Sequence, residues 1–150
     1  MKLPQDLSEV LAHLRSTYPD EGCGLILRKE EETFRVRPMS NAYDRYHAKD
    51  PDRFPRTART AYLFDPKEQL HAYAEAEARG ETICCIYHSH CDAGAYFSAE
   101  DKVMAAPDGE PILPGVGYLV VAIDQGRPTA AKLFWWEDGN FQEASVPLPL

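Results

Sequence analysis

Two imidazole side chains, those of His88 and His90, are separated by a single residue at the end of a β-prone run. Residues 82–87, just before them, are largely apolar, which predicts a buried strand. Because side chains alternate along a strand, His88 and His90 project to one face and Ser89 projects to the other. Two imidazoles on one face at the end of a strand can bind the same metal ion.

A Ser-x-x-Asp pattern, from Ser98 to Asp101, follows the second histidine after seven intervening residues. Residues three apart share a face of a helix, so this pair is expected on a helix that starts near Ser98. Two histidines and one aspartate give three protein ligands and leave a fourth tetrahedral position for water, which is typical of catalytic zinc sites. Alone, each pattern has a simpler interpretation, as a surface histidine pair or a capped helix. Together, at this spacing, they favour a metal site.

The His-x-His and Ser-x-x-Asp patterns, at this spacing, resemble the JAMM signature of the JAB/MPN metallopeptidases. That family also has a glutamate upstream, near a Cys-Gly pair that opens a strand, and Glu21 ahead of Cys23 is similar to it. The resemblance extends from the first helix to about Phe134. It is closest to the compact bacterial branch, whose members resemble proteases that cut after the Gly-Gly tail of ubiquitin-like sulfur carriers.

The resemblance implies a zinc-dependent metalloprotease that hydrolyses the amide or isopeptide bond after the C-terminal Gly-Gly of a ubiquitin-like or sulfur-carrier protein. It implies that Zn²⁺ is bound by His88, His90 and Asp101. Glu21 would accept a proton from water and return it to the leaving amine, and Ser98 would donate to the oxyanion. Zinc would lower the pKa of its water toward about 7, but iron(II) accepts the same ligand types.

Three other functions compete with this one. A non-catalytic MPN-type scaffold or interaction module usually lacks the metal ligands, and all of them are present here. A deaminase needs His-x-Glu and Pro-Cys-x-x-Cys motifs, which are absent. The DNA-repair-associated JAB branch usually reads His-x-His-Pro-Ser-Gly, which this loop does not.

Two positions near the motif, Cys91 and Phe97, depart from many relatives, which have proline at both. Cys91 is an additional soft donor, an oxidation-sensitive thiol, or a loop residue without chemistry. Phe97 is expected to change the approach to Ser98 while leaving every reacting group present.

Length and composition predict one globular domain spanning residues 1–150. The net charge is -8 and no basic run appears, so nucleic acid is not expected as a partner. No signal-peptide core and no apolar stretch near 18 residues are present, so we expect a cytoplasmic protein without membrane attachment. The four cysteines form no C-x-x-C pair and are expected to be thiols, with Cys84 and Cys85 on opposite faces of their strand.

The remaining pattern predicts an α/β sandwich with a mixed sheet flanked by helices. The family resemblance implies the same architecture, the JAB/MPN fold, which is similar to that of cytidine deaminases. The expected helices span residues 4–17, 66–79 and 98–106, and the expected strands span residues 23–29, 33–38, 82–87, 117–123, 129–136 and 140–146.

Residues 43–60 contain aromatics, prolines and four arginines but show no steady period. Compact relatives usually lack most of this stretch, so it resembles an insertion. A loop this long is usually functional or disordered. Its basic side chains outnumber its three aspartates, so it either meets an acidic carrier protein or is a disordered or self-packed surface loop. The basic residues are Arg45, Lys49, Arg53, Arg56 and Arg59.

Overall fold

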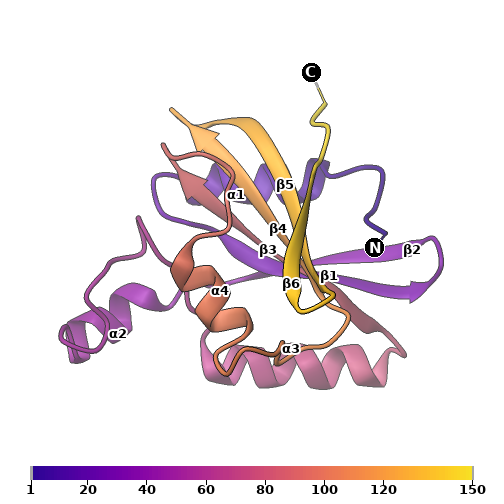
Figure 1. The fold of residues 1–150 in the computed structure, drawn as a ribbon, viewed down its shortest axis with the longest axis horizontal. Coiled ribbons are helices and arrows are strands. Elements are labelled where there is room, and N and C mark those ends of the chain that lie inside the picture. The colour runs from indigo at the N-terminus through magenta and orange to yellow at the C-terminus, as the bar shows by residue number, and fades with distance from the viewer. Residues whose placement is uncertain (1, 150) are drawn as a thin grey trace.

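The computed structural model describes residues 2–149, which form a six-stranded mixed sheet and four helices (Figure 1). The strands lie in the order β2-β1-β3-β4-β5-β6, and within residues 2–149 only β3 and β4 run parallel. The predicted α/β class is therefore confirmed. The strands are β1 (Cys23–Glu30), β2 (Thr33–Met39), β3 (Thr82–Cys91), β4 (Gly117–Asp124), β5 (Arg127–Glu137) and β6 (Asn140–Ser145). The helices are α1 (Ser8–Thr17), α2 (Tyr43–Lys49), α3 (Pro66–Ala78) and α4 (Ala99–Ala105).

Two hydrophobic layers cover the two faces of the sheet, because successive side chains of a strand point to opposite faces. One layer contains Val10 and Leu14 of α1. The other contains Ala72 and Ala76 of α3 and Ala105 of α4. In Figure 1, α1 accordingly lies behind the strands and α4 in front of them. The central strands β1, β3 and β4 are buried on both sides, which places anything attached to β3 deep in the molecule.

Most predicted elements are found close to their expected bounds, with two informative differences. Helix α1 begins at Ser8 instead of residue 4, because the Asp6 carboxylate accepts from the Ser8 backbone N–H at 2.9 Å in a turn that precedes the helix. Strand β3 continues to Cys91, so both histidines lie within the strand, where His88 pairs with Val120 of β4.

The prediction that Cys84 and Cys85 lie on opposite faces of their strand is wrong. The pairing of β1 with β3 skips one residue, since Ile26 pairs with Cys85 and Leu27 pairs with Ile83. Cys84 is the extra residue of this β-bulge, and both cysteines are buried in the layer beneath α1. All four cysteines of the chain are free thiols.

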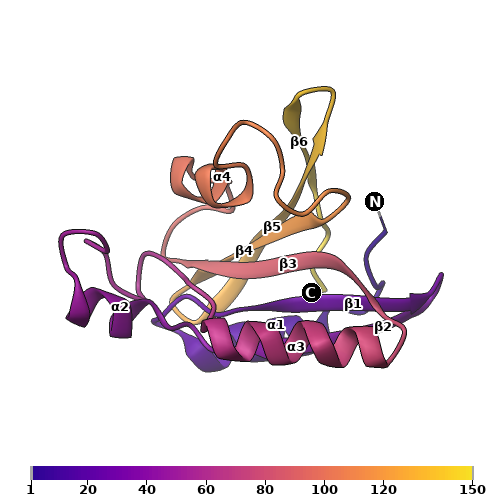
Figure 2. The ribbon, with the colours of Figure 1, turned by 90° about the horizontal axis from the view of Figure 1, so that it is seen from below.

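The stretch predicted as a long loop, residues 43–60, is folded. It contains α2, and the Asp44 carboxylate accepts from the Ala58 backbone N–H at 2.7 Å. The ring of Phe54 packs against those of Tyr43 and Tyr46, with centroids 6.0 and 5.2 Å apart. Sequence periodicity missed α2 because seven residues are too few to establish a helical pattern. Figures 1 and 2 both show α2 at one end of the molecule, away from the sheet.

The helices within residues 2–149 are short, and the longest, α3, has 13 residues. None of them has the length and apolar character needed to cross a membrane.

Candidate metal centre and catalytic pocket

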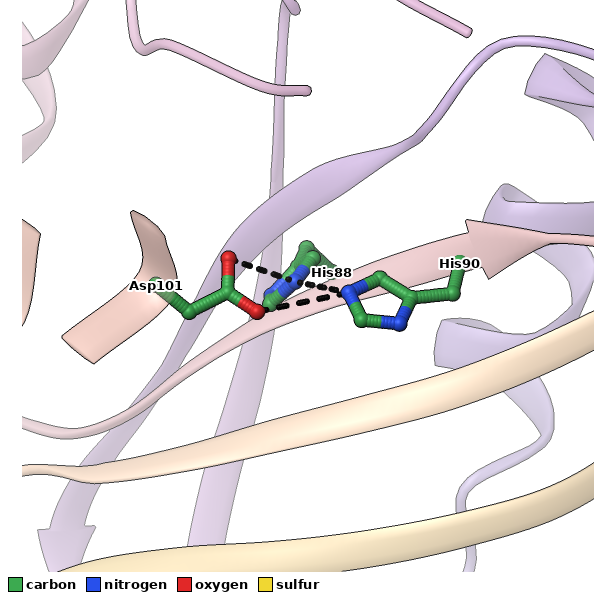
Figure 3. A group of neighbouring side chains, drawn as sticks. All are labelled: His88, His90 and Asp101. Atoms are coloured by element: carbon green, nitrogen blue, oxygen red, sulfur yellow. Dashed lines mark hydrogen bonds and ion pairs between the residues drawn. The ribbon is translucent and has the colours of Figure 1, made fainter. Parts of the chain in front are cut away.

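Three buried side chains converge where β3 meets α4: His88, His90 and Asp101 (Figure 3). The Nε2 atoms of the two histidines are 3.3 Å apart. His90 Nε2 lies 3.3 Å from Asp101 Oδ2, and His88 Nε2 lies 3.4 Å from Asp101 Oδ1. The exposed fractions are 0%, 5% and 9% for His88, His90 and Asp101. The sequence-predicted ligands are thus brought together away from solvent.

The donor atoms of this group fit a metal ion. A tetrahedral site with bonds of about 2.0–2.1 Å has ligand atoms about 3.3–3.4 Å apart, which is the spacing seen here. The Nδ1 of His90 lies 3.0 Å from the carbonyl oxygen of Gly94. When Nδ1 carries the proton and donates to this carbonyl, the Nε2 lone pair is directed at the centre of the group. The buried His-His-Asp group therefore fits a metal site.

Electrostatics keeps His88 and Asp101 in the states that bind a metal ion. Burial lowers the pKa of His88, so its imidazole is neutral. Burial by itself disfavours the charged form of Asp101, but hydrogen bonds with His88 and His90 outweigh it and lower the pKa of this carboxyl. Neutral imidazoles and an ionised carboxylate are the forms that bind a divalent cation.

The imidazole of His88 is held by stacking on an aromatic ring, and in the part of the chain that the structure describes its Nδ1 is not fixed by a hydrogen bond. The Tyr62 ring lies over its imidazole with centroids 4.4 Å apart and an angle of 27° between the planes. Within residues 2–149, the buried Nδ1 of His88 has no hydrogen-bond partner. Tyr62 was not predicted to belong to the site, because no motif or spacing in the sequence links residue 62 to the histidines.

Ser98 caps α4, which is the simpler interpretation that the sequence offered for the Ser-x-x-Asp pattern. Its Oγ accepts from the Asp101 backbone N–H at 3.0 Å, and the Ser98 backbone N–H donates to Asp101 Oδ2 at 3.0 Å, which forms a capping box at the start of α4. Accepting a hydrogen bond leaves the Ser98 hydroxyl proton free to donate elsewhere. The cap also fixes Asp101, so one turn of helix positions both residues.

Four hydrogen bonds of the backbone at residues 21 and 22 position Glu21 at the site. Its N–H donates to the Ala58 carbonyl at 2.7 Å, and the Nδ2 of Asn41 donates to the Glu21 carbonyl at 2.9 Å. The next residue, Gly22, donates to Ser89 Oγ at 2.8 Å and accepts from the Ser89 N–H at 3.0 Å. Ser89 faces away from the metal group, as predicted, and ties the glutamate segment to β3.

Close packing explains why glycine occupies the positions on both sides of Cys23. A Cβ atom on Gly22 would lie 2.5 Å from Thr17 Oγ1, and one on Gly24 would lie 2.4 Å from the ring of Tyr87. These contacts involve side chains packed beneath β1, so larger residues would displace the strand that follows Glu21.

The Glu21 carboxyl is 5% exposed and no ion pair stabilises its charge within residues 2–149. Burial, followed by the charge of Asp101, raises its pKa to about 9. A cation held between the histidines and Asp101 would act in the opposite direction and favour the carboxylate.

One pocket of about 140 Å³ is lined by Glu21, His90, Ser98 and Asp101. His88 lies behind these side chains and is fully buried. Four of the five sequence-predicted site residues therefore face one cavity, and the fifth supports them from beneath. A pocket in which a few ionisable groups converge is a common form of an active site.

The two departures from the family pattern have different positions. Cys91 lines the pocket, but burial and the charge of Glu21 raise the pKa of its thiol to about 11. Phe97 was expected to change the approach to Ser98, yet its ring is buried in the core, stacked on Phe134 with centroids 4.9 Å apart. Phe97 thus anchors the loop that carries Ser98.

Asn41 is a second residue that the sequence prediction missed. Its Nδ2 donates to the carbonyls of Glu21 and Ala61, at 2.9 and 3.0 Å. Its Oδ1 accepts from the backbone N–H groups of Tyr43 and Leu63, at 3.0 and 3.2 Å. One side chain therefore joins the glutamate segment, α2 and residues 58–63. The signal available in the sequence was the residue type, because an asparagine between a strand and a helix often forms hydrogen bonds with nearby backbone groups.

The class of the protein follows from comparison with known sequences. A profile described as prokaryotic homologues of the JAB domain matches residues 4–137. The chain therefore belongs to the prokaryotic JAB family, as the motif predicted. A solution structure of a Desulfitobacterium hafniense protein superposes with a TM-score of 0.65 at 26% identity, over 95% of this chain and 88% of that chain.

Two sequence relatives carry functional names. The CysO-cysteine peptidase of Mycobacterium tuberculosis is 34% identical over 110 residues, which cover 71% of this chain and 66% of the relative. The chain thus spans just under two thirds of the length of that relative. The desampylase of Haloferax volcanii is 29% identical over 143 residues, which cover 91% of this chain and 87% of the relative.

Proposed function

We propose that the chain is a zinc-dependent metalloprotease that hydrolyses the bond after the C-terminal Gly-Gly of a ubiquitin-like or sulfur-carrier protein. The observation that carries this proposal is the buried group of His88, His90 and Asp101, which adjoins Glu21 and Ser98 in one pocket. The names of its relatives, a peptidase of a CysO-cysteine adduct and a desampylase, support the class of substrate.

Zinc bound by the two histidines and Asp101 would supply a polarised carbonyl and an acidified water. The carboxylate of Glu21 takes one proton from the attacking water, whose oxygen forms a bond to the glycine carbonyl carbon. The C–N bond then breaks, and Glu21 gives the same proton to the leaving amine. The products are a carrier with a free glycine carboxyl group, which keeps the second proton of the water until it ionises, and a released amine.

Ser98 stabilises the oxyanion that develops on the glycine carbonyl. Its hydroxyl proton is free to donate because its oxygen already accepts from the Asp101 backbone N–H. The capping box holds the hydroxyl in place before substrate arrives, and such preorganised donors contribute about 3–4 kcal/mol to transition-state stabilisation.

A glycine tail suits the narrow pocket, because residues without side chains can pass beside the groups that line it. The folded part of the carrier would pack against a second hollow of about 360 Å³ between α2 and α4, the α2–α4 groove, and insert side chains into it. Tyr43, Glu100 and Met104 line both the groove and the pocket, so the two hollows adjoin each other. The groove is lined by Tyr43, Phe54, Leu63, Ala99, Glu100, Val103 and Met104.

The insertion contributes less free positive charge to this surface than its sequence suggests. Arg45 forms an ion pair with Asp65, and Arg56 pairs with Glu100 at 2.6 Å. Within residues 2–149, Lys49, Arg53 and Arg59 form no ion pair and remain available to an acidic carrier. We place this activity in the reducing cytoplasm, where the four free thiols are stable.

The proposal is tested with a ubiquitin-like carrier joined through Gly-Gly to a reporter amine. The zinc-loaded protein should release the amine and leave a carrier that ends in glycine, as measured by mass spectrometry. A carrier with Ala-Ala in place of Gly-Gly is the matched control and should be cut at least tenfold more slowly. Equal cleavage of both carriers contradicts the proposed substrate class.

A scaffold function is the alternative, and the same experiment separates the two. A scaffold would bind the carrier without releasing the amine at any zinc concentration. Retention of all three donor residues in ligand-like geometry favours the enzyme.

A further inference from the structure

Arg59 is a cation in the catalytic pocket that forms no ion pair within residues 2–149. The pocket is lined by two arginines, and Arg56 is paired with Glu100 at 2.6 Å. Arg59 also lines the pocket, is exposed, and forms no ion pair or side-chain hydrogen bond within residues 2–149. A guanidinium without a carboxylate partner inside an active-site pocket is suited to bind an anionic group of a ligand.

The backbone next to Arg59 contacts the segment that carries the proposed proton donor, Glu21. Ala58, its neighbour, accepts the hydrogen bond from the Glu21 N–H at 2.7 Å. The charge of Arg59 also acts on Tyr18 and Asp92, and Asp92 directly follows Cys91, which lines the pocket.

Asp92, an acid on which the charge of Arg59 acts, forms no ion pair with it within residues 2–149. Both carboxylate oxygens of Asp92 already accept hydrogen bonds, one from the Tyr18 hydroxyl at 2.6 Å and one from the Gln125 N–H at 2.8 Å. Asp92 therefore holds the loop after β3 to its surroundings, while Arg59 remains directed to the pocket that it lines.

We propose that Arg59 binds the α-carboxylate of the leaving group, so that the preferred substrate is a carrier whose Gly-Gly tail is joined to a single α-amino acid. This inference rests on the proposed function, in which Glu21 returns a proton to the leaving amine. The leaving amine must then lie beside Glu21. In an α-amino acid, one carbon separates that nitrogen from a carboxylate, so the anion falls within the same end of the pocket.

A protein lysine presents different chemistry at this position. The carbon next to its ε-amine carries only another methylene, so an isopeptide substrate brings no anion to Arg59. Arg59 thus acts as a specificity-determining residue: it discriminates between leaving groups and takes no part in proton transfer.

The test compares two substrates that differ in one group. A ubiquitin-like carrier ending in Gly-Gly is joined to alanine with a free carboxylate, or to alanine amide. The zinc-loaded wild-type protein should show a kcat/KM about 10- to 100-fold higher for the carboxylate, which is the range of a charge-assisted hydrogen bond. Arg59→Gln should reduce this ratio to within about threefold, and Arg59→Lys should retain part of it.

Arg15→Gln is the matched control, because Arg15 is exposed on α1, across the sheet from the pocket, and its removal changes the net charge equally. It should leave the ratio unchanged. A wild-type ratio near one, or an Arg59→Gln variant that keeps the full ratio, overturns the inference while leaving proteolysis intact. Failure of the wild-type protein to cut either substrate contradicts the proposed function and the inference with it.

Discussion

At the scale of single residues, the site is defined by how burial and charge set the state of each ionisable group. Glu21 has two requirements that conflict in the absence of a cation: a carboxylate is needed to accept a proton, yet burial favours the neutral acid. Glu21 stays buried despite the free-energy cost of burying its charge, because hydrogen bonds with Ala58, Asn41 and Ser89 hold the segment around it in place.

The burial of Glu21 predicts a pH-dependent stability of the metal-free protein. Its pKa is about 9 when folded and 4.5 ordinarily, so its contribution to stability is present below pH 4.5 and is lost as pH rises toward 9. Glu21→Gln should therefore raise the free energy of unfolding at pH 8 by on the order of 2–4 kcal/mol, with little effect at pH 4.5. Urea denaturation at the two pH values measures this. A difference from wild type that does not change with pH argues against a buried acid.

Substitution of Ser98 is expected to lower the catalytic rate without reducing metal binding. Ser98→Ala should lower kcat about 100- to 1,000-fold through loss of the oxyanion donor, and lower stability by about 1 kcal/mol through loss of the cap. Zinc content should stay at the wild-type level. Ser98→Thr keeps the hydroxyl and the cap and serves as the control. If the alanine and threonine variants turn over at the same rate, Ser98 is a cap alone.

At the scale of elements, the sequence predicted the chemistry-bearing strand and helix correctly because both follow local rules. Alternation along β3 places His88 and His90 together, and three-residue spacing places Ser98 with Asp101. The bulge at Cys84 was not predictable, since it depends on pairing with the distant strand β1. Glu21 was assigned through family resemblance, because local pattern does not reveal which segments lie side by side.

The contact between Gly22 and Ser89 predicts an effect on catalysis from behind the site. Ser89→Ala leaves the Gly22 N–H buried without a partner, which should cost about 1–3 kcal/mol of stability. Displacement of the adjacent Glu21 should lower kcat about tenfold while zinc content is kept. Ser16→Ala, on the exposed side of α1, removes a comparable hydroxyl and should change neither quantity. Wild-type turnover by the Ser89→Ala variant contradicts a positioning role.

At the scale of the whole molecule, the insertion at residues 43–60 is an ordered segment that forms part of the pocket wall. Its ordering depends on contacts far apart in sequence, such as that between Asn41 and Leu63, which no periodic pattern encodes. Deleting it would remove the Ala58 carbonyl that holds Glu21, so its recognition role needs point substitutions in the α2–α4 groove.

Val103 provides such a test, because it lines the α2–α4 groove and is 62% exposed. Val103→Asp should raise KM for a full-length carrier about tenfold through loss of apolar contact, and leave cleavage of a short Gly-Gly peptide unchanged. Leu70→Asp is the control, since Leu70 is 72% exposed on α3 and lies outside the groove. Equal effects of both variants on the carrier indicate that it does not occupy the groove.

The central claim is that His88, His90 and Asp101 hold the metal on which hydrolysis depends. The most direct measurement is a titration of chelated protein with zinc, in which release of the amine from a Gly-Gly-linked carrier is followed at each zinc concentration. We predict that the rate rises in proportion to zinc and reaches its limit at one ion per chain. In the His88→Ala/His90→Ala variant, zinc should restore no cleavage. Cleavage that proceeds without zinc, or that zinc restores equally in this variant, would contradict the account.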